Sequence, residues 1–245
     1  MLLPFSKYIV KLVLKLIPVT EDEKHENLDV KYIDDRMIET PSIAVGNAFL
    51  EIKEMANYAK ESVQYAIEGI LNNSREEVEK TFEMEKKVNQ IQRQLLAFLV
   101  KLSKESLNED ERNKVTNLIY AVNDIERISD HGENIAELGR DLINENLSLS
   151  EHAEDEIREI YNLAINNFTD SMKCLEEINL QLRKQVHENE RQVDLLEIGY
   201  RNHHLQRLND GKCTVDSGVI YFDILNNLER ISDHSKNIAD YSYDI

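Results

Sequence analysis

The residues best suited to chemistry occur in two copies of the segment ERISDH, at residues 126–131 and 229–234. An asparagine follows each copy by three residues. On an α-helix, residues four positions apart share a face, so each copy presents a stripe of Glu, Asp and Asn oxygens. Such oxygens are ligands for hard cations such as Mg²⁺, Mn²⁺ or iron. The candidate metal ligands are Glu126, Asp130, Asn134, Glu229, Asp233 and Asn237.

Carboxylates stacked one turn apart repel each other by a few tenths of a kcal/mol per pair, so something should offset this cost. Two explanations are open. In the first, Arg127 and Arg230 pair with carboxylates on neighbouring helices, and the stripe is an ordinary solvated acidic face. In the second, the stripe binds a cation, which would need further ligands from another helix. The acids available for that role are Glu83, Glu85, Glu188 and Glu190. Spacing alone leaves both explanations open.

His131 and His234 lie between the acidic stripe and the apolar face of their helices, a position more typical of a hydrogen-bonded interface residue than of a ligand. The sequence lacks the Glu-x-x-His pairs of di-iron bundles and any glycine-rich phosphate loop. We therefore expect a protein that is not an enzyme. The alternatives are a metal-dependent enzyme acting on a phosphorylated substrate and a purely structural helical module.

The elements that carry these segments are predicted to be helices throughout. All three prolines lie in the first 41 residues, and the chain has only seven glycines. We expect a break between the fourth and fifth helices near residues 182–185, and a loop at residues 209–218 before the sixth. The expected helix starts are Thr40 before Pro41, Ser74 with Glu77, Asn108 with Glu111, and Ser148 with Glu151.

The second half of the chain repeats the first at an offset of about 105 residues, or about 103 for the ERISDH helices. Short connections place consecutive helices side by side, so the repeat predicts two tandem antiparallel three-helix bundles, at residues 41–146 and 147–245. A core face is expected on the first ERISDH helix. Its members are Leu118, Ala121, Val122, Ile125, Ile128, Gly132, Ile135 and Ala136.

Residues 1–18 form an apolar run that carries Lys7, Lys11 and Lys15 on one helical face. The run is shorter than the ~20 residues of a membrane span and lacks a signal-peptide cleavage site. We expect a membrane-proximal helix, lying on the membrane surface or forming the cytoplasmic end of a longer span. An amphipathic helix docked on the bundle is the alternative. Residues 19–40 are charged and are predicted to be a linker.

The net charge of the chain indicates which classes of binding partner to expect. A net charge of -18, from 47 acidic against 29 basic residues, argues against nucleic acid and favours cations or basic protein surfaces. Cys174 and Cys213 are too few for a disulfide scaffold or a thiolate metal site. We expect them to be reduced thiols in the cytosol.

The repeated unit resembles PhoU domains. Its two copies read DIERISDHGENIA at residues 124–136 and NLERISDHSKNIA at residues 227–239, and the match covers about residues 41–241. The resemblance implies a regulator of phosphate uptake whose Glu/Asp-x-x-x-Asp motifs hold multinuclear metal clusters. Carried over, it implicates Glu126, Asp130, Glu229 and Asp233, with the two asparagines as weaker candidates. The expected cofactor is a multivalent metal ion, with iron, Mg, Mn and Zn as candidates among which the resemblance does not choose.

The segment DDRMIETPSIAVGNA at residues 34–48 follows the basic apolar run. It is similar to the junction between the membrane domain and the cytoplasmic PhoU-like domain of bacterial Na⁺/phosphate cotransporter proteins. This implies a place at the cytoplasmic face of the membrane, with a membrane phosphate transporter as partner in cis or trans. The membrane helices of such a transporter are missing from this chain. A free-standing PhoU-type regulator is the alternative, and a homodimer is among the expected partners.

Overall fold

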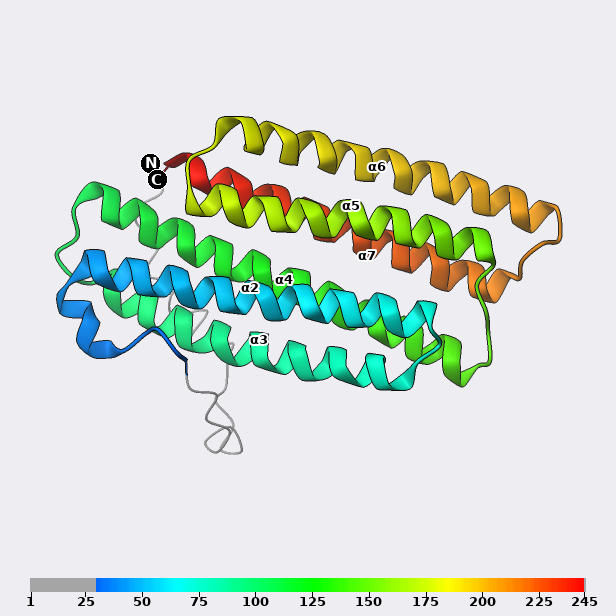
Figure 1. Cartoon of the computed structure of the whole chain (residues 1–245), viewed down its shortest axis with the longest axis horizontal. Coiled ribbons are helices and arrows are strands. Elements are labelled where there is room, and N and C mark those ends of the chain that lie inside the picture. Colours follow the sequence, from blue (N-terminus) through cyan, green and yellow to red (C-terminus); the bar gives the residue numbers. More distant parts are fainter. Residues whose placement is uncertain (1–29, 245) are drawn as a thin grey trace, which may run out of the picture.

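The computed structural model describes residues 30–244, which fold into two groups of three long helices (Figure 1). The all-α prediction is confirmed, since no strand occurs among the described residues. The predicted N-terminal helix, with Lys7, Lys11 and Lys15, lies outside the described residues. No helix in the described region is long and apolar enough to span a bilayer.

The helices follow one another along the chain in two sets. The first set is the short 3-10 helix η2 (Asp35–Glu39), α2 (Pro41–Leu71), α3 (Arg75–Leu102) and α4 (Glu109–Asn144). The second set is α5 (Glu151–Glu176), α6 (Leu180–Asn209), α7 (Val215–Asp240) and the 3-10 helix η3 (Tyr241–Asp244). Within each set the three long helices pack on one another, so two antiparallel three-helix bundles form, as the repeat predicts.

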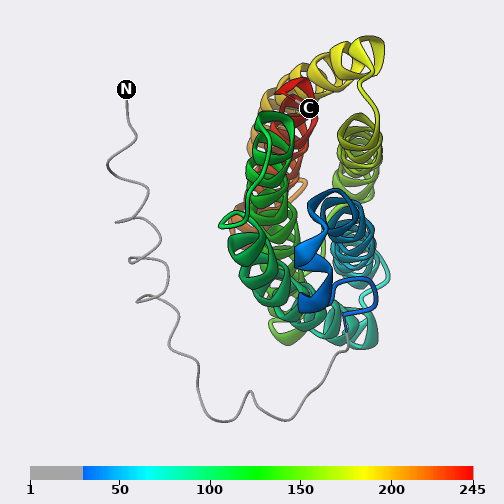
Figure 2. The same cartoon turned by 90° about the vertical axis from the view of Figure 1, so that its left-hand side faces the viewer.

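The two bundles join mainly along α4 and α7, the helices that carry the ERISDH segments. In Figure 1, α3 and α6 run along the two outer edges of the molecule, and the view along the helices in Figure 2 shows them at opposite ends of the cross-section. The chemistry-bearing helices are therefore central, and each has an outer helix of its own bundle beside it.

Three predicted helix starts are confirmed, two of them by side-chain capping hydrogen bonds. Helix α2 begins at Pro41, and Ser74 Oγ caps α3 by accepting from the Glu77 backbone N–H. Before α4, the Asn108 side chain accepts from the Glu111 N–H at 2.8 Å, and the Glu111 carboxylate accepts from the Asn108 N–H at 3.1 Å. This reciprocal pair is a complete capping box, which satisfies two otherwise unpaired donors.

The boundaries in the second bundle differ from the prediction. Helix α5 is capped by Ser150 and not by Ser148. The predicted break near residues 182–185 is wrong, because Asn179 caps α6 by accepting from the Leu182 N–H at 3.0 Å. Helix α7 begins at Val215, so Gly218 belongs to its first turn and not to the preceding loop. A Cβ atom at Gly218 would overlap the His204 ring, which explains a glycine at that helical position.

The predicted core face of α4 is confirmed, since all eight of its residues are buried. The opposite bundle contributes a matching face on α7, with Ile224, Leu228, Ile231 and Ile238 fully buried. Ile128 and Ile231, the isoleucines of the two ERISDH segments, therefore serve packing. The Glu and Asp residues of the two segments are not part of this packed core. The residues around them decide what they can bind.

Candidate metal centre

The acidic stripe of α4 faces the outer helix α3 and is partly enclosed. The side chains of Glu126 and Asp130 are 21% and 32% exposed. Glu85 on α3 is buried, and its carboxylate accepts a hydrogen bond from the Asn89 side chain one turn later. The first acidic cluster, defined as Glu85, Glu126 and Asp130 with Asn89 beside them, thus brings together side-chain oxygens from two helices.

The electrostatics of the first acidic cluster are unfavourable in the absence of a cation. Burial, followed by the negative charges of Glu133, Asp130 and Glu126, raises the pKa of Glu85 to about 7. Burial and Asp130 raise the pKa of Glu126, and burial raises that of Asp130. Carboxylates that are desolvated and close together favour a bound proton or cation that removes the repulsion.

The second acidic cluster lies between α6 and α7 and comprises Glu190, Asp194, Glu229 and Asp233. One ligand atom each from Glu190, Asp194 and Asp233 lies within 4.8 Å of the others, a spacing that could hold one ion. Asp194 Oδ1 and Glu229 Oε2 are buried without a hydrogen-bond donor, although Arg230 Nε lies 3.4 Å from Glu229 Oε2 as an ion-pair partner. Burial comes first among the causes that raise the pKa of both groups, followed by neighbouring carboxylates. Buried acceptors without donors are uncommon, and a cation would satisfy them.

The two clusters differ in charge at equivalent positions. Asp194 in the second cluster corresponds to Asn89 in the first, so the second has one carboxylate more. Lys236 compensates part of that charge through a short contact with Glu190. The two clusters therefore differ in their distribution of charge at equivalent positions.

The arginines pair with acids of their own helix. Arg127 Nη1 lies 3.5 Å from Asp130 Oδ2, and Arg230 Nη1 lies 3.3 Å from Asp233 Oδ2. Both arginines are more than half exposed, so each pair is a weak surface interaction. The arginines also lie near the glutamates of the stripe, with Arg127 Nε 3.9 Å from Glu126 Oε2 and Arg230 Nε 3.4 Å from Glu229 Oε2. They therefore screen both acids of each ERISDH segment from the solvent side.

The two asparagines of the stripe reach the joint between the bundles. Asn134 Nδ2 donates to Asn227 Oδ1 at 3.3 Å, and Asn237 Nδ2 lies 3.4 Å from Asp124 Oδ1 on the other side. The amide nitrogens of both side chains are thus engaged across the α4–α7 joint.

His131 and His234 also serve this joint, as predicted. His131 Nδ1 lies 2.8 Å from Asn227 Oδ1, and His234 Nδ1 lies 2.7 Å from Asp124 Oδ1. The two imidazole rings are 5.5 Å apart. Burial lowers the pKa of His131 despite its hydrogen bond to Asn227. Each histidine thus contributes one hydrogen bond across the joint between the two bundles.

The structure shows which of the four acids on the neighbouring helices lie close enough to the stripes to act as further ligands. Glu85 and Glu190 are buried and face the stripes, whereas Glu83 and Glu188 are exposed. Sequence reasoning missed Asp194. Its signal was the four-residue spacing from Glu190, which repeats the spacing of the ERISDH acids.

The comparison with known families agrees with this architecture. The sequence pattern of the PhoU domain matches residues 52–139 and 157–242, one match in each bundle and together more than half of the chain. The chain belongs to the PhoU domain family.

Curated relatives of this PhoU-domain chain are distant. It is 18% identical over 236 residues to YjbB of Salmonella typhimurium, a protein provisionally assigned to inorganic phosphate export; the match covers 94% of the chain but only 42% of YjbB. It is 22% identical over 192 residues to the phosphate-specific transport system accessory protein PhoU homolog 1 of Thermotoga maritima, covering 78% of the chain and 82% of that protein. The chain thus spans less than half of one relative and most of the other.

Solved structures of PhoU proteins share the fold. PhoU from Pseudomonas aeruginosa superposes with a TM-score of 0.74 at 19% identity, covering 84% of this chain and 96% of the other. The phosphate transport system regulatory protein PhoU from Streptococcus pneumoniae gives 0.73 at 17% identity, covering 84% and 94%. At such low identity the similarity establishes the six-helix fold alone.

Proposed function

We propose that this PhoU-domain chain is a non-enzymatic regulator of phosphate transport that acts on a membrane transporter, with its two acidic clusters as metal sites. The observation that carries the metal site of the second cluster is the convergence of Glu190, Asp194 and Asp233 within 4.8 Å, beside the buried Asp194 Oδ1 that has no donor. The first cluster is proposed by its correspondence to the second and by the raised pKa of Glu85. The transport role is supported by the two relatives described above, whose names both refer to phosphate transport.

This function could be carried out in two ways, as part of a longer transporter or as a separate protein. In the first, the chain is the cytoplasmic part of a Na⁺/phosphate cotransporter-type protein, supported by the basic apolar residues 1–18 and by a relative more than twice its length. In the second, it is a free-standing PhoU-type regulator, supported by the Thermotoga maritima homologue, whose length it largely covers. Both place the chain at the cytoplasmic face of the membrane.

The transport role predicts a change in phosphate flux. Cells that lack the chain are expected to move radiolabelled phosphate across the membrane at an altered rate, and the full chain should restore the original rate. A variant without residues 1–18 should fail to restore it if that segment provides the membrane contact. Circular dichroism of the variant checks that the helices persist. Flux that is unchanged when the chain is absent would contradict the proposal.

The metal sites predict stoichiometric binding of iron, Mn, Mg or Zn to protein purified without chelators. The double variant Asp130→Asn with Asp233→Asn should lose about tenfold or more in affinity, because it removes a charged ligand from each cluster. Elemental analysis and titration calorimetry measure this loss. The matched control is Glu83→Gln with Glu188→Gln, which removes the same charge from exposed positions on the adjacent outer helices. Equal affinities of the two double variants would show that the net charge, and not the clusters, attracts the metal.

A further inference from the structure

Helix α6 carries two apolar stripes on opposite faces. The first, with Val193 and Tyr200, is buried in the bundle. The second, with Leu195, Ile198 and Leu205, lies on roughly the opposite side of the helix, because successive residues are ~100° apart. These three side chains are 66%, 57% and 49% exposed. The first stripe attaches α6 to its own bundle, so the second stripe serves no contact among the described residues of that bundle.

The second stripe has the spacing of a coiled coil. Leu195, Ile198, Asn202 and Leu205 follow one another at intervals of three, four and three residues, and all four are exposed. This is the spacing of the a and d positions of a heptad repeat, which pack against a second helix. A single asparagine among apolar a and d residues is a known device for fixing the register of such a pair. We call these four residues the α6 seam.

The equivalent face of the first bundle has no such seam. At an offset of about 105 residues, Gln90 and Arg93 of α3 stand where α6 has Leu195 and Ile198. The same structural position is therefore polar in one bundle and apolar in the other. The repeated three-helix unit does not require apolar residues there.

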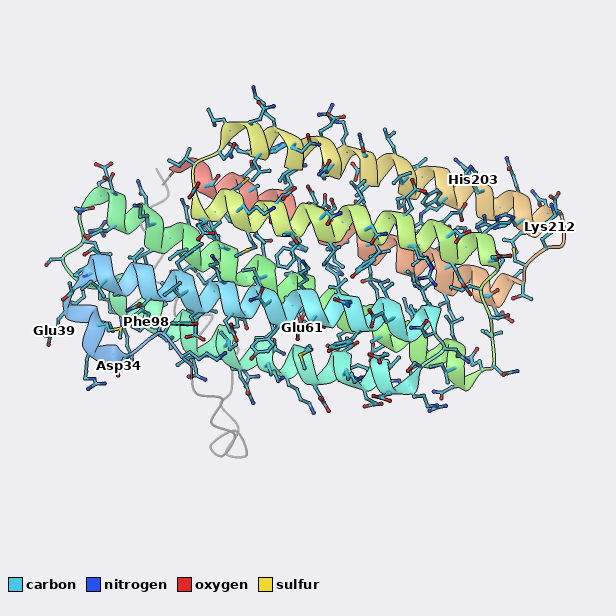
Figure 3. The ribbon with its side chains drawn as sticks, in the orientation of Figure 1. Asp34, Glu39, Glu61, Phe98, His203 and Lys212 are labelled. Atoms are coloured by element: carbon cyan, nitrogen blue, oxygen red, sulfur yellow. The ribbon has the colours of Figure 1, made fainter. Side chains whose placement is uncertain are left out.

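The α6 seam is accessible along its whole length. Helix α6 forms an outer edge of the molecule, and no other described element lies beyond it (Figure 1). In Figure 3 side chains of α6 project outward from this edge, and the labelled His203 marks the part of the helix that contains the seam. A second helix can therefore lie alongside α6 without meeting another part of the described chain.

The charge of α6 allows two copies of the chain to meet there. The chain carries 47 acidic against 29 basic residues, so two copies repel each other over most of their surfaces. Helix α6 carries five basic and four acidic residues and is close to neutral. Two α6 helices would thus bury their apolar seams against each other with little electrostatic cost.

We propose that a second copy of this chain docks on the α6 seam, with the two α6 helices antiparallel. In an antiparallel pair each a position packs against a d position of the other helix. Leu195 of each copy then lies opposite Leu205 of the other, and Ile198 lies opposite Asn202. The seam is its own complement in this register, as a two-fold dimer requires.

Gly199, directly beside the seam, fits the same register. The antiparallel order places it opposite Gly199 of the second copy. A Cβ atom at this position would meet no atom within 4 Å, so the fold of one chain does not require this glycine. A glycine inside a helix costs about 1 kcal/mol relative to alanine, and its use is the close approach of another backbone.

The charged residue at the start of the stripe favours the antiparallel order. Arg191 is exposed and precedes Leu195 by four residues, and Asn209 follows Leu205 by four. A parallel pair would place Arg191 against its own counterpart, whereas the antiparallel pair places it opposite Asn209. The parallel order is therefore disfavoured by repulsion between like charges.

The dimer is expected to be weak and to depend on concentration. The seam spans 11 residues, or about 16 Å of helix, so it buries less surface than a permanent dimer interface. This association goes beyond the proposed regulation of transport. It does not involve the second acidic cluster, because Glu190 and Asp194 lie on the side of α6 that faces α7.

Analytical ultracentrifugation of the full chain over a range of concentrations tests the association. The variant Leu195→Gln with Ile198→Gln should weaken dimer formation about tenfold or more, because it removes two apolar anchors without changing charge. Both positions are exposed, so the variant should fold normally, which circular dichroism checks. The matched control is Ile43→Gln with Leu50→Gln, two residues of α2 that are 56% and 42% exposed. It should dimerise like the wild type.

Chemical cross-linking with a short bis-maleimide reagent tests the antiparallel order. Gly199→Cys should give a covalent dimer, because the two introduced cysteines face each other. Gln192→Cys is the matched control on the same side of the helix, and its two cysteines would lie about 20 Å apart. The wild type, whose Cys174 is buried and whose Cys213 is partly exposed, measures the background. Equal cross-linking at residues 192 and 199 would overturn the antiparallel order.

Three results would overturn the proposal as a whole. The first is a chain that stays monomeric at every concentration. The second is a dimer that the Leu195→Gln with Ile198→Gln variant leaves unchanged, which would place the interface elsewhere. The third is a monomer that dimerises only when residues 1–18 are removed, which would assign the seam to the apolar N-terminal residues of the same chain.

Discussion

Replacing Glu156 with alanine is expected to lower the free energy of unfolding by about 3–5 kcal/mol at neutral pH, because it breaks a buried ion pair. Glu156 accepts two hydrogen bonds from Arg207, at 3.0 and 2.8 Å, and one from the Tyr221 hydroxyl at 2.5 Å. The Glu156 and Arg207 side chains are only 12% and 11% exposed. Without the carboxylate, a buried guanidinium and a buried hydroxyl would both lose their acceptor.

The effect of this substitution should depend on pH. Burial alone would raise the pKa of Glu156, but hydrogen bonds from Arg207, Tyr221 and His203 outweigh it and lower the pKa below its ordinary value. A carboxylate with a lowered folded-state pKa stabilises the protein above its unfolded pKa, and this contribution is lost as the pH falls through the folded pKa. The difference between wild type and Glu156→Ala should therefore shrink in acid.

Urea denaturation at several pH values measures both effects. The control is Glu188→Ala, which removes an exposed carboxylate that forms a surface ion pair with Arg191. It should change stability by no more than about 0.5 kcal/mol. A loss below about 1 kcal/mol for Glu156→Ala would mean that the network is solvated and not structural.

Glu85→Gln is expected to stabilise the metal-free protein by about 1–3 kcal/mol at about pH 8. The pKa of Glu85 is raised to about 7 by burial and by the carboxylates of Glu133, Asp130 and Glu126. A raised carboxyl pKa means that the folded state prefers the protonated form, so wild-type stability falls as the pH rises from the unfolded value of about 4.5 through 7. Glutamine has no charge to lose, and the two proteins should converge below about pH 4.

A cation should reverse this ranking. Metal binding favours the ionised carboxylate, so added Mn²⁺ should stabilise the wild type at about pH 8 more than it stabilises Glu85→Gln. Thermal unfolding with chelator and with Mn²⁺ measures both differences. Glu83→Gln, an exposed position on the same helix, should behave like the wild type in both conditions. A lower stability of Glu85→Gln in chelator would show that the Glu85 carboxylate stabilises the first cluster instead of straining it.

Most of the fold follows from local physical chemistry. The absence of proline after residue 41, the capping box at Asn108 and Glu111, and the 3.6-residue apolar period were sufficient to place α2, α3 and α4 and to identify the core face of α4. The constant offset between the two halves of the chain predicted that the six helices form two equivalent three-helix bundles. These features depend on neighbouring residues or on internal repetition, both of which are visible in the sequence.

The errors fell where several local signals compete. Ser148 and Ser150 can both cap a helix, and Asn179 gives a cap before α6 that the apolar pattern did not reveal, since α6 buries so few side chains. Gly218 looked like a loop residue, but the His204 ring from another helix occupies the space that a side chain would need. A contact distant in sequence decided only the Gly218 case, because the caps at Ser150 and Asn179 are hydrogen bonds to backbone groups three residues further on.

The candidate site divides in the same way. The sequence by itself determined that Glu126, Asp130, Glu229 and Asp233 form repeated stripes. The reason is that the helical period sets the direction in which each side chain points around the helix axis. Only the tertiary structure decided which residues of neighbouring helices lie opposite each face of α4 and α7. It buries Glu85 and Glu190 opposite the stripes, adds Asp194, and directs Asn134 and Asn237 to the α4–α7 joint. The physical reason is that packing between helices, and not the period within one, sets both desolvation and the partners across each interface.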